Sequence, residues 1–295
     1  MRLEIAYVGT TGIDLSRARQ LNTKIIVPQQ SLLELRQLYP QFGSIVSQES
    51  SGRSRYDALQ LRVTRRFSGL MFDGSYVFSK ALDNGSGPLT DSRNDPLLWA
   101  RSAFDRRHNL VMSYAYDLPA PRAAGVIGQL AGGWQVSGIS EFRSGLPMDI
   151  SQSFDSTLTG RSLFSRPDFV GPYLRFDPRR QQTIVINGVQ QTGHFFFDPR
   201  AFQPVYVRRA ADARPGDLGR NVFDGPGLAL WSLSVSKQIR LACSQQLNLR
   251  ADIRNLFNHA NFQTPGLQAD VGSSFGQVSL AAPGRTVQLS LTYSV

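Results

Sequence analysis

The chain has 295 residues, of which 41% are hydrophobic and 18% charged, and its formal net charge is +10 at pH 7. This length fits one large domain or two ordinary ones, and the composition excludes a disordered polyelectrolyte. No stretch approaches the roughly 18 consecutive apolar residues that a transmembrane helix needs. A membrane β-barrel remains possible, because its signal in each strand is much weaker.

The positive charge comes mainly from arginine, because Lys24, Lys80 and Lys237 are the only lysines. The arginines are scattered among aspartates, whereas nucleic-acid binders usually carry clustered basic patches. We therefore expect solvated or paired loop charges and no nucleic-acid partner. The single Cys243 cannot form an internal disulfide, and we expect it to be a small residue in a turn.

Eight stretches alternate apolar and polar residues with a period of two, as in β-strands with one apolar face. In the clearest stretch, at the C-terminus, Val287, Leu289 and Leu291 alternate with polar residues. Such an apolar strand needs a paired edge and a face that meets lipid or a core. The predicted strands are residues 2–8, 56–67, 70–79, 109–117, 133–143, 231–240, 246–254 and 285–295.

The connections between these strands differ in length. Ser68 and Gly69 predict a tight hairpin turn, and residues 31–40 fit a short helix that ends at Pro40. The longest connection, residues 144–227, is rich in Pro, Gly, Arg and Asp, and its segments TIVING and HFFF fit an additional hairpin. Long and shorter connections alternate along the chain, which places all long loops at one end of an antiparallel meander.

The pattern predicts an all-β fold, an antiparallel meander of about eight strands that forms part of a transmembrane β-barrel with an open or incomplete wall. Strands of about ten residues can cross a bilayer at a tilt. We expect the apolar faces to contact lipid and the polar faces to line a wet lumen. The polar faces carry Arg62, Arg66, Glu141, Arg143, Arg240, Arg250, Asp252 and Arg254.

Some residues depart from the simple alternation. Arg65 next to the short turn and Lys80 at the far end of its strand have positions from which they can snorkel to an interface. Lys237 interrupts the apolar face and counts against a membrane barrel, and Ile139 is out of step with its strand. Aromatic residues near the strand ends fit interfacial girdles. They are Phe67, Phe78, Tyr116, Trp134, Phe142, Trp231 and Tyr293.

The residues that carry chemistry predict no catalytic, cofactor-binding or metal site. The sequence DRRH, residues 105–108, contains a histidine without a partner at ligand spacing, so a structural role at the start of a strand is favoured. The spacing of Asp91, Asp95 and Asp105 matches no calcium loop, so ordinary loop solvation is favoured. No glycine-rich stretch lies between a strand and a helix, so no phosphate-binding loop is indicated.

Three asparagines follow the seventh predicted strand, and their expected role is structural. We expect Asn255, Asn258 and Asn261 to fix the outer end of the seventh strand through bonds from their side chains to the backbone. A ligand contact by these residues is the weaker alternative. The GPG sequence of residues 225–227 is typical of a loop.

Several blocks of sequence follow one another in a characteristic order. They are YVGTTG, SRYDALQLRVTRRFSGLMFDGSYVFSKALD, FDRRHNLVMSYAYDLP, GWQVSGISEFRSGLP, GRNVFDGPG, LRADIRNLFNHANF and RTVQLSLTYSV. These blocks span nearly the whole chain and resemble the C-terminal barrel of Oar-like TonB-dependent outer-membrane receptors, which carry an N-terminal carboxypeptidase-regulatory-like domain. The resemblance implies a location in the cell outer membrane, contact with outer-membrane lipid, and import of an unknown bulky solute.

Full receptors of this class have about 22 strands and a plugged lumen. The sequence shows no plug, no TonB-contacting segment and no signal peptide, and it ends at Val295 instead of the aromatic residue common in such barrels. We therefore expect residues 1–295 to be a single domain, a C-terminal fragment of such a barrel. TonB would be contacted only through the missing N-terminal part.

Three alternatives remain open. The chain could be a complete eight-stranded structural or adhesin barrel, which requires the first and last strands to pair. It could be an outer-membrane hydrolase that uses His108 and Ser113, although no third partner has suitable spacing. A soluble nucleic-acid-binding β protein is the weakest alternative, and salt-dependent binding to DNA would support it.

Overall fold

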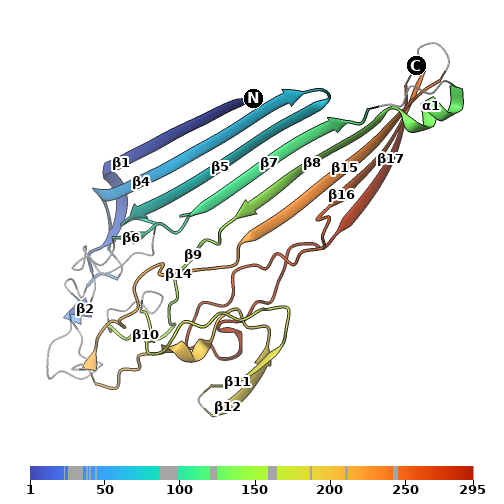
Figure 1. Cartoon of the computed structure of the whole chain (residues 1–295). Helices are drawn as coiled ribbons and strands as arrows, with labels where there is room; N and C mark the ends of the chain where they lie inside the picture. Colours follow the sequence, from blue (N-terminus) through green and yellow to red (C-terminus); the bar gives the residue numbers. More distant parts are fainter. Residues whose placement is uncertain are drawn as a thin grey trace.

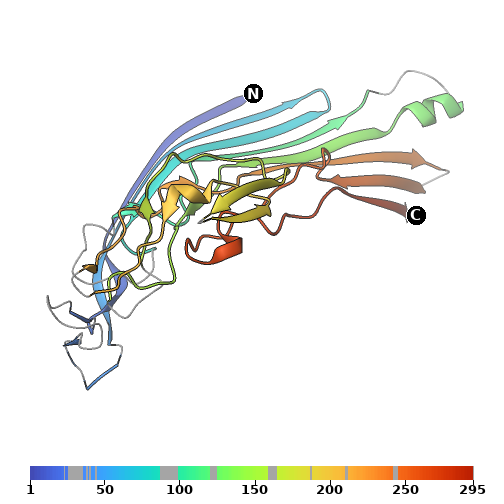
Figure 2. The same cartoon turned by 90° about the horizontal axis from the view of Figure 1, so that it is seen from below.

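The computed structural model describes residues 1–22, 24–25, 36–37, 39, 41–43, 45–86, 99–119, 125–158, 165–186, 188–209, 212–241 and 245–294. These residues form one large antiparallel sheet with a body of folded loops at one end (Figure 1). After a rotation of 90°, the sheet is seen to be curved (Figure 2). In the described part of the chain, no helix is long and apolar enough to cross a bilayer.

The large sheet has the strand order β1-β4-β5-β7-β8-β15-β16-β17, with the short strand β6 paired to β5. Neighbours in this order are antiparallel and follow one another along the chain, so the predicted eight-stranded meander is confirmed. The strands are β1 (Arg2–Gln20), β4 (Val46–Phe67), β5 (Leu70–Asp83), β6 (Ala100–Arg101), β7 (His108–Asp117), β8 (Trp134–Arg143), β15 (Leu228–Arg240), β16 (Gln246–Arg254) and β17 (Thr286–Ser294).

The sheet is open, because β1 and β17 are its two edges and do not pair with each other within the described residues. Pairing of the first and last strands is the feature that a closed eight-stranded barrel requires. The expectation of an open or incomplete barrel is therefore confirmed.

The strands β1 and β4 extend well beyond the predicted ranges. They pair from Arg2 and Thr64 as far as Gln20 and Val46, with irregular register around Leu15. The 19 residues of β1 span roughly 60 Å at about 3.3 Å per residue. This is about twice the thickness of the bilayer hydrocarbon. The distal half lies outside the membrane and needs no apolar face, so the alternation that predicts strands is absent there.

Short connections leave one end of the sheet and long connections leave the other (Figure 1). Ser68 and Gly69 join β4 to β5 with φ angles of 41° and 80°, as expected for a two-residue hairpin turn with positive φ at both positions. The helix α1 (Gly125–Ala131) lies in the connection from β7 to β8, at the same end as this turn. This helix was not among the predicted elements, but the predicted segregation of loop lengths is confirmed.

Two predictions about the loops need correction. Residues 31–40 lie mostly outside the described residues, but Arg36–Gln37 form the strand β3, which pairs with β2 (Lys24–Ile25). The predicted helix is wrong for these two residues, because pairing overrides local helix propensity. The TIVING segment does form a hairpin, as β11 (Gln182–Ile186), but its partner is β12 (Val189–Gly193) and not HFFF.

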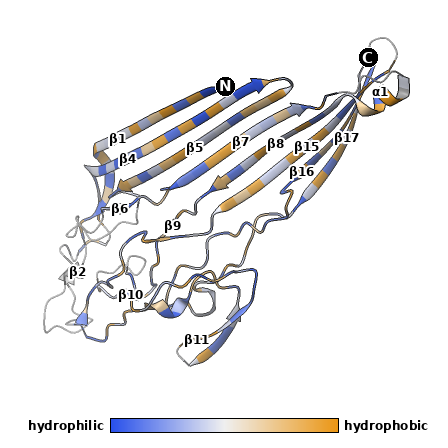
Figure 3. Ribbon diagram, in the orientation of Figure 1, coloured by the Kyte–Doolittle hydropathy of each residue, from blue (hydrophilic) through white to orange (hydrophobic). Residues whose placement is uncertain are grey.

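The register gives the large sheet an apolar and a polar face, and Figure 3 shows the resulting alternation along the strands. On the apolar face, Leu233 pairs with Ile253, and Ala251 pairs with Leu289. Leu289 is 77% exposed and Leu249 is 42% exposed, so no second sheet covers this face. The prediction that these side chains contact lipid, not a core between two sheets, agrees with this exposure.

The described loops of residues 144–227 and 255–285 fold together into one unit, the loop body. Its core is largely aromatic, and Phe195 and Phe197 are fully buried, which explains why HFFF is not a hairpin strand. The core cluster consists of Met148, Ile150, Phe196, Phe197, Ala201, Phe202, Leu218, Phe275 and Val278. Its short elements are β9 (Pro147–Met148), β10 (Asp168–Phe169), η4 (Pro199–Ala201), β13 (Phe202–Gln203), β14 (Phe223–Asp224) and η6 (Gly272–Ser274).

Candidate functional site

The polar face of the sheet is hollowed into a trough of about 1110 Å³ that extends from β1 to β16. Its middle is lined by small side chains of β7, β8 and β15, and longer charged side chains line both sides. The small residues are Ser113, Ala115, Ser137, Ser232 and Ser234. Because side chains alternate between the two faces of a strand, these hydroxyls point to the same side as the charged residues.

The charged residues of the trough carry both signs. Arg62 forms an ion pair of 2.9 Å with Asp73 on one side, and Arg250 forms one of 2.9 Å with Asp252 on the other. The Ser234 hydroxyl also donates a hydrogen bond to Asp252. The ion-paired side chains are exposed, so each pair contributes only about 0–1 kcal/mol to stability. Their consequence is a hydrated surface suited to a polar solute.

The other predicted polar-face residues also lie on this side of the sheet. Glu141 accepts a bond of 2.8 Å from Arg143. Arg66, Arg240 and Arg254 meet no carboxylate within the described residues and leave unpaired positive charge on the wall. Ile139 lies on the polar face as well, between Ser113 and Ser232, and is 51% exposed. Its departure from the apolar alternation is therefore real and places an apolar side chain in the trough.

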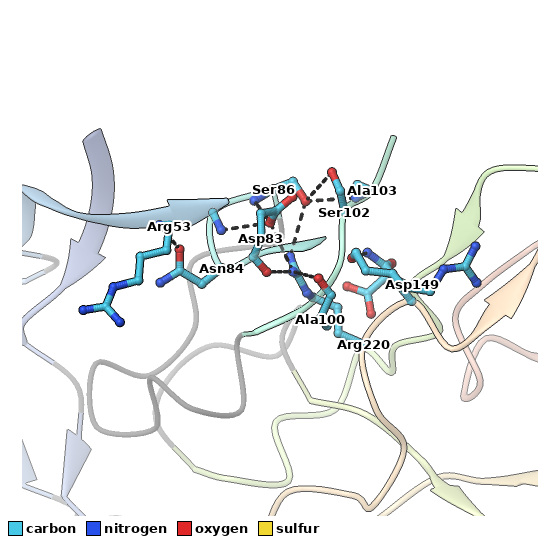
Figure 4. Close-up of polar contacts among 12 residues, drawn as sticks. Arg53, Asp83, Asn84, Ser86, Ala100, Ser102, Ala103, Asp149 and Arg220 are labelled. Carbon is cyan, nitrogen blue, oxygen red and sulfur yellow. Dashed lines mark hydrogen bonds and ion pairs between the residues drawn. The ribbon is translucent and has the colours of Figure 1, made fainter. Parts of the chain in front are cut away.

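A buried ion pair attaches the loop body to the outer end of the polar face. Arg220 of the loop body donates from Nη2 to the Asp83 carboxylate at 3.1 Å and to the Asp83 carbonyl oxygen at 2.5 Å. Their side chains are 2% and 9% exposed. In Figure 4, Arg220 reaches between Asp83, Ser86 and Ala100. Because Asp83 ends β5, this contact holds the loop body against the wall.

Further contacts beside this pair have the same effect. Arg101 of β6 forms ion pairs with Asp105 at 3.0 Å and with Asp224 of the loop body at 2.6 Å. The Asn221 side chain donates to the Arg101 carbonyl oxygen at 2.7 Å. Asn221 has a φ of 57°, a conformation that asparagine tolerates better than most residues. Arg220 and Asn221 thus both hold the loop body against the ends of β5 and β6.

No sequence pattern predicted a role for Arg220 or Asp83. They are 137 residues apart, so no local spacing relates them. The available signal was weak, because GRNVFDGPG matched a family block without indicating a contact. Only the folding of the long loop brings these residues together.

Carboxylates also connect the segments of the loop body to one another. Asp270 accepts hydrogen bonds from the Ser153 amide at 2.7 Å, the Ser153 hydroxyl at 2.6 Å and the Phe154 amide at 2.8 Å. Burial tends to raise the pKa of Asp270, but these bonds outweigh burial and lower the pKa below its usual value. The ionised carboxylate therefore joins the loop after β8 to the loop after β16.

The pKa values of Asp168 and Tyr173, both in the loop body, are shifted in opposite directions. The hydrogen bond from Arg214 to Asp168, 2.6 Å long, lowers the pKa of that carboxyl. Burial raises the pKa of Tyr173 to about 12, and its ring stacks on Phe223 with centroids 4.0 Å apart. Tyr173 is therefore a neutral part of the aromatic core and not a proton donor at ordinary pH.

The structure separates His108 and Ser113, the two candidate hydrolase residues. His108 pairs with Phe78 on the apolar face, and its Nδ1 lies 2.8 Å from the Tyr76 hydroxyl. Ser113 pairs with Asp73 on the opposite, polar face. Because the two side chains point to opposite faces of the sheet, they cannot act together on one substrate.

The remaining DRRH residues make contacts at the start of β7. Asp105 is 1% exposed and accepts from the Ala81 amide at 2.8 Å. Arg106 donates to the Ser144 carbonyl oxygen at 2.9 Å. These contacts agree with the expected structural role. Within the described residues no three His, Cys, Asp or Glu side chains form a metal-ligand group, and Asp91, Asp95 and Cys243 lie outside those residues.

The asparagine prediction is confirmed. Asn255 Nδ2 donates to the His259 carbonyl oxygen at 2.9 Å, and Asn255 Oδ1 accepts from the His259 amide at 2.9 Å. Asn258 accepts from the Arg285 amide at 2.9 Å and Asn261 from the Ala229 amide at 2.8 Å. All three side chains fix the backbone at the outer ends of β15, β16 and β17.

Lys237, which counts against a membrane barrel in sequence analysis, has a local explanation. Its ammonium group donates to the carbonyl oxygens of Gln129 and Gly132 at the end of α1. It also lies 5.3 Å from the centre of the Trp134 ring, and Lys237 is only 4% exposed. Helix α1, absent from the sequence prediction, therefore shields this charge on the apolar face.

An antiparallel sheet with an exposed apolar face, a hydrated polar face and long loops at one end is the architecture of an outer-membrane barrel wall. Residues 1–288 match the outer membrane beta barrel domain family, and the chain belongs to this family. The protein is thus located in the outer membrane.

Among solved structures, the chain is similar to the outer membrane transporter YddB from Escherichia coli, with 10% sequence identity and a TM-score of 0.48. The similarity covers 98% of this chain, which spans 30% of the length of that transporter. No curated protein matches the chain.

Proposed function

We propose that the chain is the C-terminal part of the barrel of an Oar-like TonB-dependent receptor that imports a bulky polar solute. The observation that carries this proposal is the attachment of the loop body to the outer end of the polar face by Arg220 and Asp83. Loops fixed above a hydrated wall form a surface that a solute meets before it enters the lumen. The sequence blocks quoted above favour this receptor class.

The open sheet supports the proposal that residues 1–295 form one domain of a larger barrel. Its edges β1 and β17 carry unpaired backbone groups, and in lipid such groups must be satisfied by further strands. In this proposal TonB is contacted through a part of the receptor outside these residues. Outer-membrane lipid contacts the apolar face, and nucleic acid is not a partner.

A non-enzymatic role forms part of the proposal. His108 and Ser113 face opposite sides of the sheet, and the charged pairs of the trough are exposed and engaged with each other. Hydroxyls and both signs of charge favour weak, reversible contacts with a polar solute.

The test is energised uptake by cells that make the protein. Labelled bulky oligosaccharides, peptides and metal chelates are supplied to cells with and without the gene, and with and without an uncoupler. We expect at least one solute to enter only in the presence of the gene and of a proton-motive force. Uptake that is independent of the gene for all solutes, or insensitive to the uncoupler, would contradict the proposal.

A pair of variants tests the role of the loop body. Arg220→Met breaks the buried contact, whereas Arg180→Met removes an exposed arginine of the same body. We expect Arg220→Met to reduce uptake and Arg180→Met to leave it unchanged. Equal uptake by both variants would show that attachment of the loop body is irrelevant to transport.

A further inference from the structure

A small charged cluster lies on the apolar face of the sheet, at the loop end of β1, β4 and β5. We call it the rim cluster, and it consists of Tyr7, Arg53, Arg55, Asp57 and Lys80. The register places Tyr7 and Phe78 in one row with Leu59 between them. In the next row outward Asp57 pairs with Lys80, and one row further Arg55 pairs with Leu82. The cluster thus continues the lipid-facing side and does not face the trough.

The distances along the strands place the cluster at the level of lipid headgroups. Tyr7 is 70% and Phe78 is 42% exposed, and aromatic side chains of this kind mark the membrane interface. Each further row lies two residues along the strand, or about 6.6 Å. Lys80 therefore lies roughly 7 Å and Arg55 roughly 13 Å beyond the aromatic row, outside the hydrocarbon.

Asp57 orients Arg55 and leaves its terminal nitrogens free. The Tyr7 hydroxyl donates to Asp57 Oδ1 at 2.6 Å, and Arg55 Nε donates to Asp57 Oδ2 at 2.8 Å. Tyr7 lies along β1 over Gly9, where an added Cβ would be only 3.0 Å from the tyrosine oxygen. The two Nη groups of Arg55 make no bond within the described residues.

The cluster has a surplus of positive charge. Its three cations and one carboxylate give 3 − 1 = +2. Lys80 meets no carboxylate within 4 Å in the described chain, and the Arg53 side chain extends away from the Asp83 contacts in Figure 4. At the first lipid-facing positions beyond Phe142 of β8 and Trp231 of β15, the chain has the neutral residues Ser144 and Ala229. The excess charge is therefore greater in this sector than at β8 and β15, and a further cation, Arg285, lies beyond Val287 of β17 on the same side of the described sheet.

We propose that the rim cluster binds the phosphate-bearing headgroup of a lipid in the outer leaflet. The free Nη groups of an oriented guanidinium match two phosphate oxygens, and Lys80 adds a point charge beside them. The ligand is a lipid and not a free phosphate, because the cluster continues the face on which Ile5 and Leu59 are exposed to the bilayer. This site rests on the outer-membrane location and is independent of solute import.

The test measures binding of lipid A by the detergent-extracted protein with native mass spectrometry. Bisphosphorylated lipid A is compared with the dephosphorylated lipid, which keeps the same acyl chains. Each cation near an anionic headgroup is worth roughly fivefold in affinity. We expect Lys80→Ser to weaken binding roughly fivefold and the triple variant R53S/R55S/K80S to weaken it on the order of 100-fold.

The matched control is R180S/R208S/R209S, which removes three positive charges from exposed positions of the loop body. We expect this variant to bind like the wild type, and Tyr7→Phe to weaken binding without a change in charge. If both triple variants lose affinity equally, or both lipids bind equally, the proposal is overturned. Lys80→Ser keeps the test valid if the triple variant does not fold, because Lys80 is exposed and has no carboxylate partner among the described residues.

Discussion

The replacement Arg220→Met tests how the loop body is held on the barrel wall. It removes a side chain that is 2% exposed and leaves the Asp83 carboxylate buried without its counter-ion. Breaking a buried ion pair by removing one partner costs about 3–5 kcal/mol. Because Arg220 joins two parts of the structure, we expect this loss to appear as local opening between the loop body and β5.

Hydrogen exchange followed by mass spectrometry, in detergent micelles, measures this opening directly. A loss of about 3–5 kcal/mol corresponds to exchange that is faster by roughly 100-fold or more. We expect this acceleration in residues 83–86, 99–105 and 220–224, and little change in β15 and β16. Arg180→Met is the control with the same change of residue type at an exposed position.

The double variant D83L/R220M separates the lost charge pair from other effects. Replacing both partners of a buried pair by apolar residues is often close to neutral. We therefore expect the double variant to recover most of the protection that Arg220→Met loses. Exchange less than tenfold faster in Arg220→Met would refute the claim that this pair holds the loop body.

Three further predictions concern other parts of the chain. Lys237→Met leaves two carbonyl oxygens of the α1 end unpaired, so unfolding in urea should require about 2–4 kcal/mol less free energy; an unchanged unfolding midpoint would contradict this. Gly145→Ala should destabilise the loop body by at least about 1–3 kcal/mol, because its Cβ would lie 1.9 Å from the Gly225 oxygen, whereas Gly85→Ala, in open space, should be neutral. The lowered pKa of Asp270 stabilises the loop body above the unfolded pKa near 3.9. This contribution is lost as pH falls through the folded pKa, so proteolysis of the loop body should become faster at acid pH. In the Asp270→Asn variant, the rate of proteolysis should depend less on pH.

The sequence predicts the structure well where one chemical rule applies along a whole strand. A wall between lipid and water requires every second residue to be apolar, so strands such as β15 and β17 could be found from alternation alone. The polar positions of Arg62 and Arg250 followed from the same rule. The role of Asn255 could also be predicted, because an asparagine at a strand end bonds to a nearby backbone.

The same rule failed outside the bilayer and in the loops. The distal half of β1 has no lipid-facing side, and polar residues such as Arg17 and Gln20 are buried there, so apolar residues are not required at every second position. Lys237 breaks the apolar alternation of its strand. The charge is tolerated there because carbonyl oxygens at the end of α1, which was not predicted, accept its hydrogen bonds. The HFFF segment has the composition of a strand, yet Phe196 and Phe197 belong to a core built from distant loops.

The all-β meander, its two faces and the end from which the long loops leave could be predicted from the sequence, because these features depend on local periodicity and loop length. How the loops fold, the contact between Arg220 and Asp83, and the placement of His108 and Ser113 on opposite sides of the wall became visible only in the folded chain. These features depend on contacts between residues far apart in the chain. Such contacts are stabilised by the burial of side chains from distant segments, and a local sequence pattern does not show which segments will meet.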